Sequence, residues 1–157
     1  MTIATITTYQ WLLSAHILAA VIWVGGALAV QAFATRAVRA GDGPYLGKLT
    51  SEIEWVGTRV FIPSSLVLVV FGFLLIHQQH YAYKFWLVFP IVIWALSFLT
   101  GAAFLGPESG RISRAIERHG VDSAEAQMRI RRIVLVSRVE LIFLLLVVLD
   151  MVLKPFS

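Results

Sequence analysis

The sequence contains no cysteine, so disulfide bonds, thiolate metal sites, iron–sulfur clusters and covalently attached haem are excluded within these 157 residues. Charge is also scarce. Asp, Glu, Lys and Arg make up 14% of the residues, whereas soluble domains carry about 25%. None of these four residue types occurs before Arg36. With 59% hydrophobic residues and a mean hydropathy of +0.82, the composition predicts an integral membrane protein.

Common enzyme motifs are missing as well. The sequence has no GxSxG, P-loop or HExxH motif, so soluble hydrolase and nucleotide chemistries lack support. Three scattered methionines provide no cluster of the soft ligands that Cu(I) prefers. We therefore leave the catalytic residues unknown and the question of enzymatic activity open.

Long apolar runs are present, and a membrane span needs about 20 such residues. Four stretches qualify, at residues 9–35, 57–78, 85–106 and 130–153. The short connection between the second and third stretches can join only neighbouring antiparallel helices. We therefore predict an all-α fold, a single membrane domain over residues 1–157 built as an up-down-up-down bundle of four transmembrane helices. No basic region precedes the first run, which we expect to remain as an anchor instead of being cleaved as a signal peptide.

The basic residues are unevenly placed, which argues against nucleic-acid binding despite the net charge of +4. Only Lys84 and Lys154 fall on one predicted side of the membrane. Ten fall on the other: Arg36, Arg39, Lys48, Arg59, Arg111, Arg114, Arg118, Arg129, Arg131 and Arg132. The positive-inside rule then predicts that loops one and three are cytoplasmic and that both termini lie outside. We expect a multi-pass protein of the bacterial cytoplasmic (inner) membrane.

Local signals place the helix ends. We expect the first helix to begin near Thr7 and to end before the Gly41–Pro44 cluster. Ser51 and Glu54 have the spacing of a capping box and predict the start of the second helix. The stretch after Pro107 is amphipathic and is predicted to lie flat among lipid headgroups. The fourth helix should begin around Ser123, whereas Pro63 and Pro90 should bend the second and third spans.

His16 lies about 7 Å inside the predicted hydrocarbon region. Ala19, Ala20, Trp23 and Ala27 share its helical face. Small residues beside an imidazole would admit a flat ring, and Trp23 would form the wall of a haem pocket whose iron is bound by His16. The alternatives are ordinary helix packing with a hydrogen bond from His16 to a neighbouring helix, and a proton relay.

Asp150 in the fourth span lies at a similar depth to His16 and on a neighbouring helix. It is a candidate to accept a hydrogen bond from His16 and fix its tautomer, or else to contact interfacial water. His77 and His80, near the outer end of the second span, are interpreted as solvated histidines, with a second axial ligand or a surface metal site as the alternative.

Arg138 and Glu140 are further ionisable residues within the fourth span. They are about 200° apart around the helix and cannot pair with each other. Gln31 in the first span is a candidate partner. These buried polar residues would either fix the helix register or form a proton or ligand path.

The run from His16 through Trp23 to Gly25 and Gly26, with a basic end at Arg36, resembles the first span of the domain-of-unknown-function 2269 family of predicted integral membrane proteins. Arg59 with Pro63, and Gly106-Pro107-Glu108, fit the same family. That resemblance implies a membrane protein but assigns no reaction. A histidine seven residues before Trp-x-Gly-Gly is more distantly similar to membrane protoporphyrinogen oxidases and copper-resistance D domain proteins, an analogy that would make His16 a haem ligand.

The sharpest functional hypothesis is therefore haem b binding for redox chemistry or haem handling, with His16 on the iron. One alternative is a non-enzymatic membrane module that packs against itself or another membrane protein through Gly25, Ala29 and Gly72. A further alternative is a proton-coupled transport component that uses Glu140 and Arg138. The lipid bilayer is the one partner that all of these hypotheses share.

Overall fold

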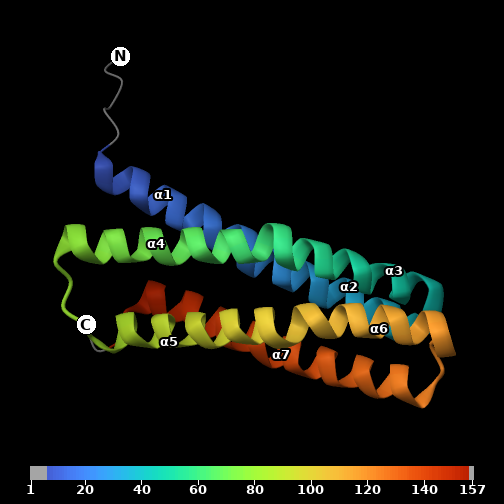
Figure 1. The fold of residues 1–157 in the computed structure, drawn as a ribbon. Helices are drawn as coiled ribbons and strands as arrows, with labels where there is room; N and C mark the ends of the chain where they lie inside the picture. Colours follow the sequence, from blue (N-terminus) through green and yellow to red (C-terminus); the bar gives the residue numbers. More distant parts are fainter. Residues whose placement is uncertain (1–6, 156–157) are drawn as a thin grey trace.

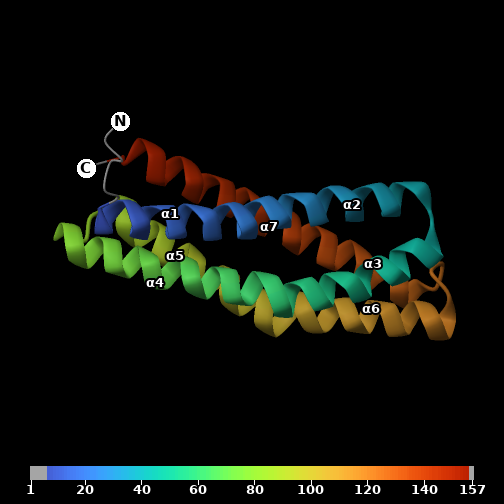
Figure 2. The same ribbon diagram turned by 90° about the horizontal axis from the view of Figure 1, so that it is seen from above.

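A computed structural model describes residues 7–155, and the regular structure in this part of the chain is all helical, with no strand. Four long rods run alternately up and down and are joined by short turns (Figures 1 and 2). In chain order they comprise α1 (Thr8–Ala20), η1 (Val21–Gly25) and α2 (Gly26–Ala40); α3 (Gly43–Val56), η2 (Gly57–Phe61) and α4 (Ile62–Gln79); α5 (Phe85–Thr100), η3 (Gly101–Leu105) and α6 (Gly106–His119); and α7 (Ala124–Leu153).

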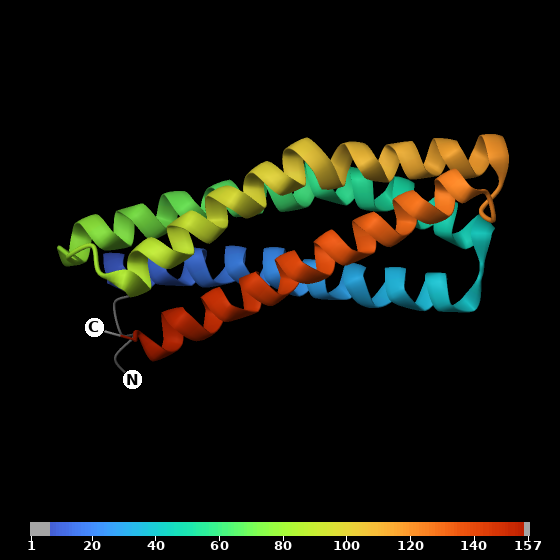
Figure 3. The same ribbon diagram turned by 90° about the horizontal axis from the view of Figure 1, so that it is seen from below.

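Three of these rods, Thr8–Ala40, Gly43–Gln79 and Phe85–His119, are long and apolar enough to cross a membrane. α7 is also long, at 30 residues, but its apolar part contains Arg138, Glu140 and Asp150. It runs obliquely across the bundle (Figure 3) and contacts α2, α5 and α6. The structure thus provides the apolar helices of an integral membrane protein.

Each of the first three rods contains a π-helical turn near its middle: η1, η2 and η3. A π turn is wider than an α turn and leaves part of the backbone hydrogen-bonding pattern out of step. Gly25, Gly57 and Gly101 occur at the ends of these turns. Pro63 follows η2 within one turn, so a prolyl residue and a π turn coincide at the predicted bend of the second rod.

The turn between the first two rods is shorter than the sequence suggested. Gly41 adopts a left-handed conformation with φ of 66° and ends α2. The main-chain N–H of Tyr45 donates to Oδ1 of Asp42, 3.0 Å away, which caps α3. The predicted helix start at Ser51 is therefore wrong, and the Ser51 hydroxyl instead donates to the Lys48 carbonyl inside the helix. Asp42 with Pro44 in the first turn is the stronger start signal.

α6 does not lie flat on the membrane surface, as its amphipathic pattern had suggested. It continues α5 through η3 and packs between α3 and α7. Pro107 lies two residues after η3, so its missing N–H falls where the π turn already interrupts the α-helical hydrogen-bond pattern. The apolar face of α6 is buried in a cluster that α2, α3 and α7 complete, composed of Ala37, Leu46, Ile112, Ala115, Ala126 and Ile130. The apolar face that was expected to contact lipid headgroups is therefore buried inside the protein.

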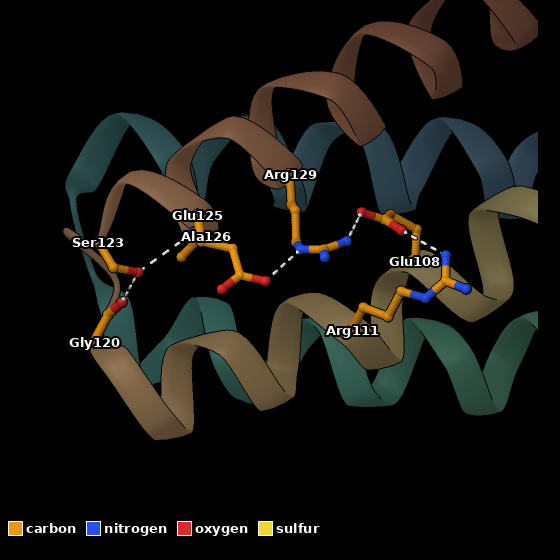
Figure 4. A network of polar contacts seen from close by, with 7 residues as sticks. All are labelled: Glu108, Arg111, Gly120, Ser123, Glu125, Ala126 and Arg129. Atoms are coloured by element: carbon orange, nitrogen blue, oxygen red, sulfur yellow. Dashed lines mark hydrogen bonds and ion pairs between the residues drawn. The ribbon is translucent and has the colours of Figure 1, made fainter.

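An ion-pair network fastens α6 to α7 just beyond the apolar part of the third rod (Figure 4). The Glu108 side chain accepts from Arg129 of α7 at 2.7 Å and from Arg111 at 3.1 Å, and Arg129 also donates to Glu125. Burial alone would raise the pKa of Glu108, but the hydrogen bonds from Arg129 and Arg111 outweigh it and lower that pKa. The contribution of Glu108 to stability is thus fully present above the ordinary glutamate pKa and is lost as the pH falls through the lowered value.

The other predicted helix starts are near their expected positions. Thr7 caps α1 in a reciprocal capping box with Gln10. α7 begins at Ala124, and its first turn is capped because the Ser123 hydroxyl accepts from the Ala126 N–H. That capping oxygen belongs to Ser123 and not to Asp122, the residue whose spacing to Glu125 resembles a capping box.

Candidate functional site

A cavity with a volume of about 560 Å³ lies between all four rods. Trp23 of η1, Phe61 of η2, Leu105 of η3 and Leu144 of α7 are among its apolar walls. Ligand sites in helix bundles form in this way, from side chains that face one another across the core. Volumes of about 300–1,000 Å³ are typical of small-molecule sites.

All three π turns contribute to this cavity. Trp23 comes from η1, Gly57 and Phe61 from η2, and Gly101 and Leu105 from η3. Because a π turn widens the helix locally, it interrupts close packing between neighbouring rods, and π turns are frequent at functional sites. The cavity is therefore positioned by backbone geometry as well as by its side chains.

A polar belt crosses the otherwise apolar middle of the cavity. It consists of Gln31, Ser65, Ser97, Ser137 and Glu140, which come from α2, α4, α5 and α7. The Ser137 hydroxyl donates to Oε1 of Gln31, 2.8 Å away. The Ser65 hydroxyl donates to the Ile62 carbonyl at 2.9 Å. This belt is where a ligand would find hydrogen-bonding partners.

Two polar groups of the belt lack an interaction partner. The carboxyl group of Glu140 lies beside the Ser97 hydroxyl, and no ion pair involves Glu140 within residues 7–155. The Nε2 atom of Gln31 is buried and has no hydrogen-bond partner in the described part of the chain. A buried amide nitrogen without an acceptor and a carboxyl group without an ion pair both reduce the stability of the fold.

His16 is anchored on the neighbouring rod. Its Nδ1 lies 2.8 Å from the carbonyl oxygen of Leu68 in α4. A carbonyl only accepts, so Nδ1 carries the proton and Nε2 keeps its lone pair. Gly72 provides the space: a Cβ there would lie 3.2 Å from Cε1 of His16. This contact is the interhelical hydrogen bond that the packing interpretation predicted, and it also orients an imidazole as a metal ligand requires.

Asp150 is 7% exposed, and its Oδ2 atom has no hydrogen-bond partner among residues 7–155. No hydrogen bond joins it to His16 in that part of the chain. The Leu68 carbonyl, and not Asp150, is the hydrogen-bond partner of the His16 ring.

His77 and His80 are exposed at the end of α4, with ring centroids 6.3 Å apart. Within the described residues no group of three His, Cys, Asp or Glu side chains is placed to hold a metal ion.

The predicted site residues separate into groups. Trp23, Gln31 and Glu140 line the cavity, whereas His16, Ala20 and Asp150 do not. Arg138 lines a different groove. Sequence reasoning missed Ser65, Ser97 and Ser137. In the sequence each of them is only a serine within an apolar helix. Such a hydroxyl commonly donates a hydrogen bond to a main-chain carbonyl of the preceding turn, so it does not indicate a site.

Long apolar helices with a largely apolar internal cavity define a helical integral membrane protein. A family model described as predicted integral membrane protein (DUF2269) matches residues 10–155, so the chain belongs to that family. No curated protein and no solved structure matched the chain.

Proposed function

We propose that this protein binds a lipophilic organic cation or amine in the cavity between its four rods. The observation that carries the proposal is Glu140, which lines a partly open and mostly apolar cavity without an ion-pair partner in the described chain. A carboxylate in such surroundings is stabilised either by a proton or by a cationic ligand.

The rest of the cavity suits the same class of ligand. Trp23 and Phe61 offer aromatic walls, and aromatic faces attract desolvated cations. Gln31 and three serines offer hydrogen bonds that fix an amine. Arg111 and Arg114 also line the cavity but are exposed side chains, on α6 and therefore away from the polar belt.

Tetraphenylphosphonium is a suitable probe, because it is apolar, cationic and small enough for the cavity. In equilibrium dialysis against the purified protein in nanodiscs, we expect saturable binding that Glu140→Gln weakens about 30-fold, the effect of removing one partner of a desolvated charge pair. Glu52→Gln, an exposed change on α3, should bind as the wild type does. Equal binding of tetraphenylborate, which has the same shape and the opposite charge, or an unchanged affinity in Glu140→Gln, would refute the proposal.

Haem b binding at His16 is the second candidate, and the orientation of its imidazole favours it. The ring presents an unprotonated Nε2, the form that binds iron, and the Leu68 carbonyl fixes that tautomer. Haem would supply redox chemistry, while His16 would hold the iron and Trp23, two turns along, would border the site. The cavity itself does not include His16, which is why this candidate comes second.

An absorption spectrum of protein purified from haem-replete cells tests that candidate. A Soret band is expected in the wild type and in His80→Ala, whose ring is exposed. His16→Ala should lose the band, because no other ligand is anchored in this way. A colourless wild type, or a band that survives His16→Ala, would eliminate haem ligation by His16.

We further propose that α7 crosses the membrane as a fourth span in the bacterial inner membrane. The start of α1, the end of α7 and the turn at residues 80–84 lie at one end of the bundle, and the turns near 41 and 120 lie at the other (Figure 1). The positive-inside rule then favours external termini.

Gly25 and Ala29 are exposed, which leaves them free for self-association, whereas the His16 ring already packs against Gly72.

A further inference from the structure

A second hollow, which we call the arginine groove, lies between α2 and α7 on the outside of the bundle. It has a volume of about 620 Å³. The groove is lined by Leu28, Gln31, Ala32, Thr35, Arg36, Arg39, Ala40 and Arg138. From Leu28 to Arg39 it extends about 16 Å along α2 at 1.5 Å per residue. Leu28 and Ala32 line the end towards the middle of the first rod, and Arg36 and Arg39 line the end where α2 terminates.

The charge of the arginine groove is uncompensated. Three guanidinium groups line it, and no carboxylate does. Within residues 7–155 the ion pairs all involve Arg111 or Arg129, so Arg36, Arg39 and Arg138 have no acidic partner there. All three side chains are exposed, and like charges that gather along one groove repel one another to the extent that salt does not screen them. An anion bound among them would remove that cost.

Helix-end effects do not account for this arrangement. Arg39 lies in the last turn of α2, where a cation interacts favourably with the helix dipole. Arg138 is on a different helix, 14 residues after Ala124, and far from either end of α7. A charged side chain inside a span is costly and usually marks a binding function. The α2 dipole therefore does not explain why Arg138 lines the same groove as two arginines of α2.

We propose that the arginine groove binds an anionic glycerophospholipid. The phosphate would lie among Arg36, Arg39 and Arg138, and an acyl chain would follow the apolar end of the groove at Leu28 and Ala32. Basic hollows between spanning helices are suited to lipid headgroups of this charge. The fit requires both a phosphate and an apolar tail, because the two ends of the groove differ in chemistry.

This site is separate from the internal cavity. Gln31 borders both spaces, and its hydrogen bond with Ser137 of α7 joins the two helices between them. Arg138 follows Ser137 directly but turns to the outer side, whereas Glu140 lines the cavity. The lipid proposal therefore stands whether or not an organic cation binds near Glu140.

Native mass spectrometry of the full chain, released from nanodiscs of equal parts phosphatidylglycerol and phosphatidylcholine, tests the proposal. We expect retained phosphatidylglycerol to exceed phosphatidylcholine several-fold on the wild type. Arg138→Gln should weaken phosphatidylglycerol binding about fivefold, the effect expected for one basic residue. Arg131→Gln makes the same change on the same helix, at an exposed residue outside the groove, and should leave binding unchanged.

Arg36→Gln provides a second variant that does not depend on α7, and Arg138→Lys should retain most of the binding because the charge is kept. Equal retention of the two lipids by the wild type would overturn the proposal. So would an equal loss in Arg131→Gln and Arg138→Gln. Displacement of the lipid by millimolar inorganic phosphate would also overturn it, because the groove would then select phosphate alone and not a lipid.

Discussion

Gly72→Leu is expected to lower the free energy of unfolding by about 3 kcal/mol, the upper part of the usual range for overpacking a core. The first added carbon would already lie 3.2 Å from Cε1 of His16. Three further carbons have no room between α1 and α4 while Nδ1 of His16 stays 2.8 Å from the Leu68 carbonyl. The new side chain must therefore separate the two rods or break that hydrogen bond. Unfolding in mixed micelles, followed by circular dichroism, measures the loss.

Gly25→Leu is the matched control, because it makes the same change in the first rod. Nothing lies within 4 Å of a Cβ at Gly25, and leucine favours helix more than glycine does. Its stability should therefore equal or slightly exceed that of the wild type. Adding His16→Ala to Gly72→Leu should recover part of the loss, since it removes the ring that the leucine meets. Equal losses at Gly72 and Gly25 would contradict this account of α1–α4 packing.

Asp150→Leu is expected to raise the free energy of unfolding by about 2 kcal/mol, the approximate cost of an unsatisfied buried polar group. Asp150 is 7% exposed, and its Oδ2 atom has no partner in the described chain. Lys154, the nearest cation along the chain, lies instead over the rings of Tyr81 and Trp86, at 5.8 and 5.1 Å from their centroids. Leucine would exchange an unpaired carboxyl group for apolar contact. The same micelle unfolding assay measures the gain.

Asp122→Leu serves as the control for Asp150→Leu, because Asp122 is exposed in the turn before α7. Its stability should stay within about 0.5 kcal/mol of the wild type, as for most surface changes. A loss of stability in Asp150→Leu would show that the carboxyl group has a favourable partner in the folded protein. A gain would indicate that the chain keeps a costly acid near one end of the bundle, which is typical of a group retained for function.

The membrane class could be predicted from composition, and the four helical segments from the apolar runs, because long uncharged stretches have few other solutions. The lengths of the helices could not. The segment at 43–50 carries glycines and a proline that resemble a loop, and the stretch after Pro107 was expected to lie flat on the membrane, yet both extend the rods as helix. They are stabilised by the shared core around Ile112 and by the Glu108 network. Such tertiary contacts override local signals.

The candidate site was only partly predictable for a similar reason. A polar or ionisable side chain in an apolar run is visible in a sequence, so Gln31, Glu140 and His16 were identified. Their neighbours were not, because the facing of each helix is set by packing. Ser137, not a charged residue, is the partner of Gln31, and a main-chain carbonyl holds His16. Every residue has a main-chain carbonyl, so the sequence does not indicate which carbonyl accepts a hydrogen bond from His16.

The three π turns have a consequence for engineering. Each holds about one residue more per turn than an α turn would. One residue represents about 100° of rotation, so everything that follows the extra residue is revolved relative to what precedes it. Deleting a single residue from Val21–Gly25 would therefore swing Gln31 out of the interior and towards the acyl chains. Gln31 and Ser65 are the two residues of the polar belt that follow a π turn in their rods, so their position on the cavity depends on η1 and η2.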